Sequence, residues 1–192
     1  MAQSLILLSV VLIVGMVLAN LPDRTGPGGG PEQPSGPTAA SAAGFGNPVG
    51  NWSFEQDLGG WRVVGPAEGV SVPQGRTSGS CASLRSRGPR PARVGLAQDG
   101  VVKGAGKGAR YVAKAWVRST GPGLKVTLRL VGSGARPESS QTDTTTLPGM
   151  AWRSVTVAHT VKVRTDLGVE VAADAVAPGD ALLVDEVTVR RG

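Results

Sequence analysis

Hydrophobic and polar residues alternate with a period of two along two neighbouring stretches, Tyr111–Arg118 and Leu124–Leu130. This alternation is typical of a β-strand with one face in a core and the other in solvent. The polar faces carry Lys114, Trp116 and Arg118 in the first stretch and Lys125 and Arg129 in the second. The residues between the stretches, Ser119–Gly123, favour a tight reversal. The pattern therefore predicts a paired hairpin whose outer face gathers four cations around Trp116.

Shorter alternating or β-branched stretches occupy much of the remaining chain after residue 46. They are Trp61–Val64, Val70–Val72, Cys81–Arg85, Val94–Val102, Gln141–Leu147, Val155–Val163, Leu167–Val171 and Ala181–Arg190, and a further short strand is expected just after Asn47. The 29 glycines and 14 prolines favour turns and argue against long helices. About ten short strands predict an all-β domain, with two packed antiparallel sheets in a sandwich or jelly roll.

One acidic residue falls among the apolar positions of the last stretch. Asp185 has the parity of Leu183, Val187 and Val189, so its carboxylate is expected to point with the core. An unpaired buried charge costs several kcal/mol, so Asp185 needs a partner. Backbone N–H groups, an arginine and a metal ion are the alternatives, and calcium is plausible because it binds carboxylate and carbonyl oxygens.

The chain offers little for catalysis. It has one cysteine, Cys81, and one histidine, His159, and no pattern brings the two together. The cysteine is expected to be a small buried hydrophobic residue, and the histidine a hydrogen-bonded core or rim residue. The glycines of Gly104–Gly108 lack the spacing of a phosphate-binding loop. These observations argue against an enzyme.

The N-terminal residues differ in composition from the rest. Leu5–Leu21 is almost wholly apolar, which predicts a hydrophobic helix over residues 1–21 that is either a signal peptide or an uncleaved anchor. Pro and Gly dominate residues 22–46 and predict a disordered linker. We therefore expect residues 47–192 to form a domain on the extracellular side of the cytoplasmic membrane, anchored or secreted. The formal charge of +6 over the full chain suits an anionic partner, and export disfavours nucleic acid.

Several motifs resemble one known group of proteins. They are Asn-x-Ser-Phe-Glu55 with Gly60-Trp61, Ser78-Gly-Ser-x-x-Ser-Leu84, Tyr111-Val-Ala-Lys-Ala-Trp-Val117, Trp152 at a strand start, and Val184-Asp-Glu-Val187. Together they resemble carbohydrate-binding modules of the CBM4/9 and CBM22-like type, over nearly all of residues 47–190. The resemblance implies a non-catalytic, galactose-binding-like β-sandwich jelly roll.

The resemblance also implies a structural calcium ion and a polysaccharide ligand. Its metal ligands would be the carboxylates of Glu55 and Asp185 with backbone carbonyls around Gly79 and Ser80. Trp61, Tyr111 and Trp152 match scaffold positions, which leaves Trp116 and Trp52 as candidate aromatic contacts and Gln98 as a polar one.

Three functions are compatible with these residues to different degrees. The first is a membrane-tethered module that binds a glycan, in which Lys114, Arg118, Lys125 and Arg129 favour an acidic one. In the second, the domain is a cell-surface structural or protein-interaction domain that has lost sugar binding, and Trp116 packs beneath long side chains or a covering loop. The third, an enzyme, has least support.

Overall fold

The computed structural model describes residues 46–77, 79–133 and 140–192, with only the backbone described for 140–142. The predicted N-terminal helix of residues 1–21 and the linker up to residue 45 lie outside these ranges, so both stay predictions. Within the described ranges, no helix is long and apolar enough to cross a membrane.

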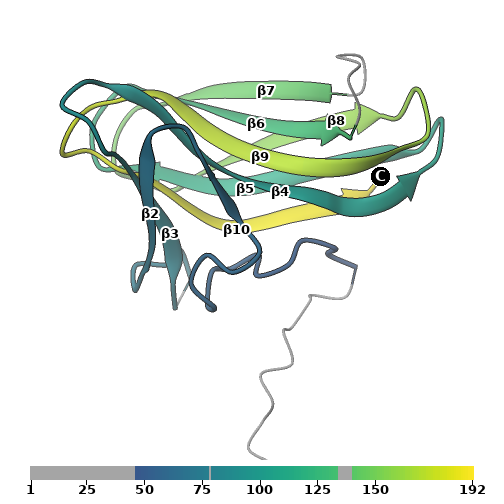
Figure 1. Ribbon diagram of the computed structural model, residues 1–192, viewed down its shortest axis with the longest axis horizontal. Helices are drawn as coiled ribbons and strands as arrows, with labels where there is room; N and C mark the ends of the chain where they lie inside the picture. The colour runs from purple at the N-terminus through teal and green to yellow at the C-terminus, as the bar shows by residue number, and fades with distance from the viewer. Residues whose placement is uncertain (1–45, 78, 134–139) are drawn as a thin grey trace, which may run out of the picture. The chain divides into compact units, whose positions relative to one another are not determined.

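Ten strands account for all the regular secondary structure of the described residues. They are β1 (Arg62–Val64), β2 (Ala67–Val72), β3 (Cys81–Ser86), β4 (Ala92–Ala105), β5 (Arg110–Ser119), β6 (Leu124–Gly132), β7 (Ser140–Leu147), β8 (Arg153–Thr160), β9 (Thr165–Val176) and β10 (Leu182–Arg191). They form two five-stranded sheets, sheet A in the order β1-β4-β9-β6-β7 and sheet B in the order β2-β3-β10-β5-β8. Figure 1 shows β6, β7 and β9 in one layer and β5 and β10 in the other. The predicted all-β sandwich is confirmed.

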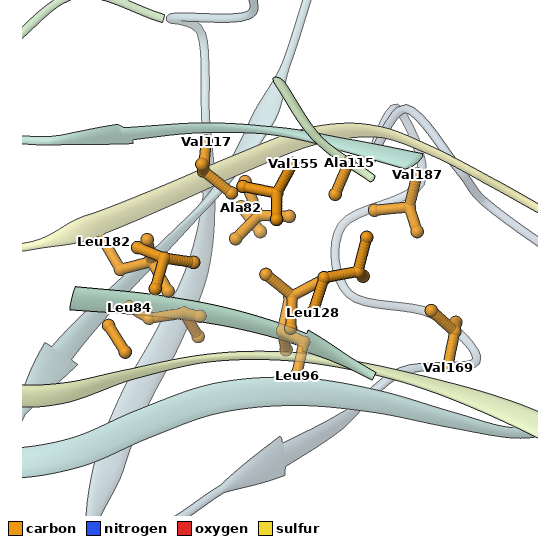
Figure 2. Close-up of a cluster of buried hydrophobic side chains, with 14 of the residues drawn as sticks. Ala82, Leu84, Leu96, Ala115, Val117, Leu128, Val155, Val169, Leu182 and Val187 are labelled. Atoms are coloured by element: carbon orange, nitrogen blue, oxygen red, sulfur yellow. The ribbon is translucent and has the colours of Figure 1, made fainter. Parts of the chain in front are cut away.

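The core lies between the two sheets because each strand places alternate apolar side chains inward. Leu96, Leu128 and Val169 come from sheet A, and Val117, Val155 and Leu182 come from sheet B. Figure 2 shows these side chains gathered between the strands. All six are 2% exposed or less, so each contributes about 1.5–3 kcal/mol of burial. Alternation along the sequence correctly predicted which face of β5, β6 and β8 is buried.

The predicted hairpin of the two alternating stretches is wrong. β5 pairs with β8 and β10, whereas β6 pairs with β7 and β9 in the other sheet. The connecting loop crosses the sandwich: Thr120 N–H bonds to the carbonyl of Ala181, and Gly123 N–H to that of Leu147. Lys125 and Arg129 of β6 therefore lie on sheet A, on a different face from Trp116.

The predicted facing of Asp185 is also wrong, because β10 contains a bulge. Val184 stands opposite Val117, Asp185 opposite Trp116, and the pairing shifts before Thr188 stands opposite Lys114. Glu186, inside the bulge, has a φ of 46°. Opposed residues of paired strands share a face, so Asp185 lies on the outer face of sheet B with Trp116. It is nevertheless 2% exposed, because a loop covers it.

The segment before β1 forms turns instead of the predicted short strand, and side chains fasten it to the sandwich. Asn47 donates to the carbonyl of Val187 and accepts from the N–H of Val189. Gln98 of β4 accepts from Gly50 N–H and donates to the carbonyls of Gly50 and Gly60. These bonds hold the entering chain against both sheets.

Candidate functional site

A shallow trough on the outer face of sheet B is the most distinctive hollow around the predicted site residues. It encloses about 340 Å³. Its walls are formed by Lys114 and Trp116 of β5, Thr156 of β8, Glu186, Thr188 and Arg190 of β10, and Arg76 from the loop before β3. We call this hollow the sheet B trough.

Strand register explains why these side chains meet. Lys114 stands opposite Thr156 on one side and Thr188 on the other, and Trp116 stands opposite Ser154 and Asp185. Side chains at opposed positions of neighbouring strands lie about 5 Å apart. One indole, one ammonium group and two threonine hydroxyls are thus brought onto one patch by three strands.

The loop between β2 and β3, of which residues 73–77, 79 and 80 are described, covers one end of this face, and we call these residues the strap. Asp185 accepts a hydrogen bond from Arg76 N–H at 2.7 Å. Glu186 accepts from the Arg76 guanidinium at 2.9 Å and from the Thr77 hydroxyl at 2.6 Å. Gln74 accepts from Arg118 at 2.9 Å. The bulge of β10 therefore supplies the two carboxylates that fasten the strap.

The strap places a cation over the candidate aromatic residue. The guanidinium carbon of Arg76 lies 4.1 Å from the centroid of the Trp116 ring, and Lys114 Nζ lies 4.8 Å from it. Arg118 is similarly placed over Trp152, at 5.2 Å. Contacts of this kind contribute about 0.5–2 kcal/mol each. Trp116 is half-buried beneath cations, as the interpretation of a covered ring predicts.

Two cations of the trough form no ion pair with a carboxylate of the described residues. Among the described residues there are six ion pairs, and five of them join residues on strands of sheet A. The sixth is Arg76 with Glu186. Lys114 and Arg190 belong to none of the six, so the trough presents positive charge available to an anionic ligand.

Two carboxylates, those of Asp185 and Glu186, are bonded to the strap, and the exposed Glu55 carboxylate is near enough to act on Asp185 electrostatically. Burial raises the pKa of Asp185, and the nearby Glu186 and Glu55 raise it further against hydrogen bonds from the N–H groups of Arg76 and Glu186. Burial also acts to raise the pKa of Glu186, but hydrogen bonds from Arg76 and Thr77 outweigh it and hold the pKa below its ordinary value. In this structure the partners of Asp185 are backbone N–H groups.

The same residues fit calcium by their donor chemistry. Glu55 Oε1 accepts from Ser80 N–H at 2.9 Å, and a side chain at Gly79 would collide with the Glu55 carboxylate. Carboxylates beside loop carbonyls are the oxygen ligands that Ca²⁺ prefers. No group of three or more His, Cys, Asp or Glu side chains within the described ranges is already arranged as a metal site.

The other predicted ligand residues lie elsewhere. Arg129 contacts Glu170 on sheet A, and Lys125 stands opposite Asp174 there. The Gln98 amide bonds the backbone of the N-terminal loop, and Trp52 packs against the main core. The trough therefore brings together Lys114 and Trp116 of the predicted set, with Arg118 at its strap end.

Sequence reasoning missed Arg76, Glu186, Thr188 and Arg190. The parity of Thr188 and Arg190 along Ala181–Arg190 marks them as outward-facing, and that signal was available. Arg76 carries no such signal, because it lies in a loop without periodicity.

Comparison with known proteins shows the fold. No family model matches the sequence, and no curated protein matches it significantly. A family 61 carbohydrate-binding module in complex with β-1,4-galactotriose superposes with a TM-score of 0.60 at 19% identity, over 76% of this chain and 99% of that chain. The chain has the fold of carbohydrate-binding modules.

Two further solved structures place this result in context. The CBM22-1 xylan-binding domain from Paenibacillus barcinonensis Xyn10C gives a TM-score of 0.57 at 15% identity, over 72% of this chain and 90% of that chain. An arabinose-bound α-L-arabinofuranosidase gives 0.61 at 13% identity, but the match covers only 26% of that enzyme. This carbohydrate-binding-module fold agrees with the resemblance seen in the sequence motifs.

Proposed function

We propose that the domain is a non-catalytic carbohydrate-binding module and that its ligand occupies the sheet B trough. The fold supports a carbohydrate partner, since neighbours of the same fold include one bound to galactotriose and one named for xylan binding. The trough supports the location, because it combines an indole with hydroxyls and cations at one surface. Indole and hydroxyl groups suit the C–H faces and hydroxyls of a pyranose.

We further propose that the glycan is acidic. The observation that carries this proposal is that Lys114 and Arg190 belong to none of the described ion pairs, in a trough whose single lining carboxylate, Glu186, is already bonded to Arg76 and Thr77. A carboxylate or sulfate group on a sugar would form charge-assisted hydrogen bonds with both cations. A neutral sugar would leave them without a partner.

Isothermal titration calorimetry tests both proposals. The probes are matched neutral and acidic polymers: hydroxyethyl and carboxymethyl cellulose, unsubstituted and glucuronic-acid-substituted xylan, and galactan with and without sulfate. Lys114→Gln and Arg190→Gln should each weaken binding of the acidic polymers by roughly fivefold, or ~1 kcal/mol. Lys125→Gln, on sheet A, is the matched control and should leave binding unchanged. Absence of heat with every polymer would refute the proposal.

We also propose that a structural calcium ion binds beside the strap. Glu55, Asp185 and the carbonyls of Gly79 and Ser80 would hold it, and the ion would neutralise the Asp185 carboxylate, whose pKa is raised by burial and by the nearby Glu186 and Glu55. We expect added Ca²⁺ to raise the melting temperature of the protein and a chelator to reverse the effect. Asp185→Asn should remove the response, and Asp143→Asn, on exposed β7, should retain it. An unchanged melting temperature in chelator contradicts the metal.

The proposed setting is the extracellular side of the cytoplasmic membrane, with residues 1–21 as anchor or signal peptide. It rests on the apolar composition of that segment. Protease treatment of intact cells expressing the full chain tests it, because a domain on the outer side is degraded and one on the inner side is protected.

One observation favours a second function. Because Arg76 covers the ring of Trp116, the domain also suits a cell-surface structural or protein-interaction role in which this ring only anchors the strap. Retention of a protein partner on the immobilised domain, with no heat from any polymer, would favour this alternative.

A further inference from the structure

The ring that a sugar would stack on is already covered. Arg76 lies 4.1 Å above the Trp116 centroid, and its guanidinium is held 2.9 Å from Glu186. The Arg76 side chain is nevertheless 33% exposed, so it can rotate into solvent without disturbing the core. Arg76 is attached to the sheet through its guanidinium group and through its backbone N–H.

We propose that Arg76 determines the ligand specificity of the trough: it shields Trp116 from neutral sugars and becomes a ligand contact for an anionic one. This inference rests on the proposed function and adds a residue and a mechanism of selection to it. Specificity arises as a difference in affinity between two ligands, and a penalty imposed on one of them is sufficient to produce it.

The penalty follows from the contacts of Arg76. A neutral sugar that stacks on Trp116 must remove the guanidinium from the ring and strain its ion pair with Glu186, and it offers no charge in return. The lost contacts correspond to on the order of tenfold in affinity. An anionic sugar meets the displaced guanidinium with two oxygens in the planar geometry that arginine favours, so the same movement gains a contact.

The surroundings of Arg76 allow this exchange. Thr77 donates to the second oxygen of Glu186 at 2.6 Å, so that carboxylate keeps one hydrogen bond when the guanidinium leaves. The backbone of Arg76 stays fastened by its N–H to Asp185. The side chain can therefore move while the strap remains in place, and Lys114 and Arg190 line the trough beside it.

Titration of three variants with the matched neutral and acidic polymers tests the inference. Arg76→Ala should strengthen binding of the neutral polymers and weaken that of the acidic ones, which lowers the acidic-to-neutral affinity ratio by at least about tenfold. Arg76→Lys keeps the charge but not the planar group, so its ratio should fall only partly. Arg87→Ala removes an exposed cation outside the trough and should not change the ratio. Melting temperatures establish that each variant is folded.

A second measurement follows the cover directly. Subtracting the fluorescence of Trp116→Phe from that of the protein with Trp116 isolates the Trp116 signal from the other three tryptophans. Acrylamide should quench this Trp116 signal more strongly in Arg76→Ala than in wild-type protein. A polymer that then binds to Arg76→Ala should lower this quenching again, because the sugar covers the ring in place of the guanidinium. Equal quenching of Trp116 in wild-type protein and in Arg76→Ala contradicts the cover.

The possible results separate the two proposals. If wild-type protein binds the acidic polymers and Arg76→Ala keeps the wild-type ratio, the role of Arg76 is wrong and the proposed function stands. If wild-type protein binds neither neutral nor acidic polymers and Arg76→Ala binds the neutral ones, the shielding role is supported and the acidic preference is wrong. If no protein binds any polymer, both proposals fail.

Discussion

His159 shows how one buried residue makes stability depend on pH. It stands opposite Tyr111 and is 4% exposed, and its Nε2 is buried without a hydrogen-bond partner among the described residues. Burial, followed by the charge of Lys162, lowers its pKa below the ordinary value. The expectation of a core residue is confirmed, whereas the expected hydrogen bond at Nε2 is not found.

The sign of the pH effect follows from this lowered pKa. The folded protein keeps His159 neutral, whereas the unfolded chain takes up a proton near pH 6.5. Above that pH, protonation of His159 does not reduce the free energy of unfolding. Below it, the free energy of unfolding declines as the pH falls towards the folded-state pKa.

His159→Leu should remove this dependence. Because the apolar side chain leaves no unsatisfied nitrogen, we expect a gain of about 1 kcal/mol at pH 7, and the difference from wild-type protein should widen from pH 6.5 to pH 5. Urea unfolding at each pH measures it. A constant difference across this range contradicts the assigned role of the imidazole.

Among the elements, the bulge in β10 determines on which face of sheet B the Asp185 carboxylate lies. Alternation back from Val187 and Val189 predicts an inward Asp185, but the bulge that follows Asp185 shifts the parity, so Asp185 lies with Leu183 on the outer face, where the strap buries it. Two hydrogen bonds from N–H groups, each 2.7 Å long, stabilise the carboxylate. The strap and the bulge are thus a single structural unit joined through Asp185.

Asp185→Asn should loosen that unit. An amide can accept only one of the two N–H bonds without presenting its own N–H₂ group to a donor. We expect a loss of about 2 kcal/mol in the free energy of unfolding, measured in urea with chelator present. Asp143→Asn is the matched control and should change stability by less than about 0.5 kcal/mol. Equal free energies of unfolding for wild-type protein and Asp185→Asn would show that the hydrogen bonds from the N–H groups contribute nothing to stability.

Alternation predicted the buried faces of β5, β6 and β8 well, but the neighbours of β5 and β6 poorly. Ala113, Ala115 and Val117 are buried as expected, because the period of two is a local property of the backbone. The partner of a strand is not local: the loop Ser119–Gly123 has the residues of a hairpin turn and yet joins two different sheets. The four-cation surface predicted around Trp116 depended on that pairing, so Lys125 and Arg129 were assigned to the wrong face.

For the whole molecule, the two sheets differ in how their charges are used. Arg93 of sheet A bonds both Glu170 and Asp174, and Arg129 lies near the same Glu170. On sheet B, cations lie over indole rings or have no acidic partner within the described ranges. A chain of net charge +6 thus presents its available positive charge mainly on one side. Approach of a polyanion to that side would be accelerated at low ionic strength.

The small apolar cluster of Cys81, Ala181 and Leu183 lies on this outer face, next to the strap. Cys81 is fully buried, and burial raises its thiol pKa to about 11. A reagent that modifies free thiolates can therefore reach it only when the local cover opens. The rate at which such a reagent labels Cys81 therefore reports how often this cover opens, and it can be measured in wild-type protein without an attached dye.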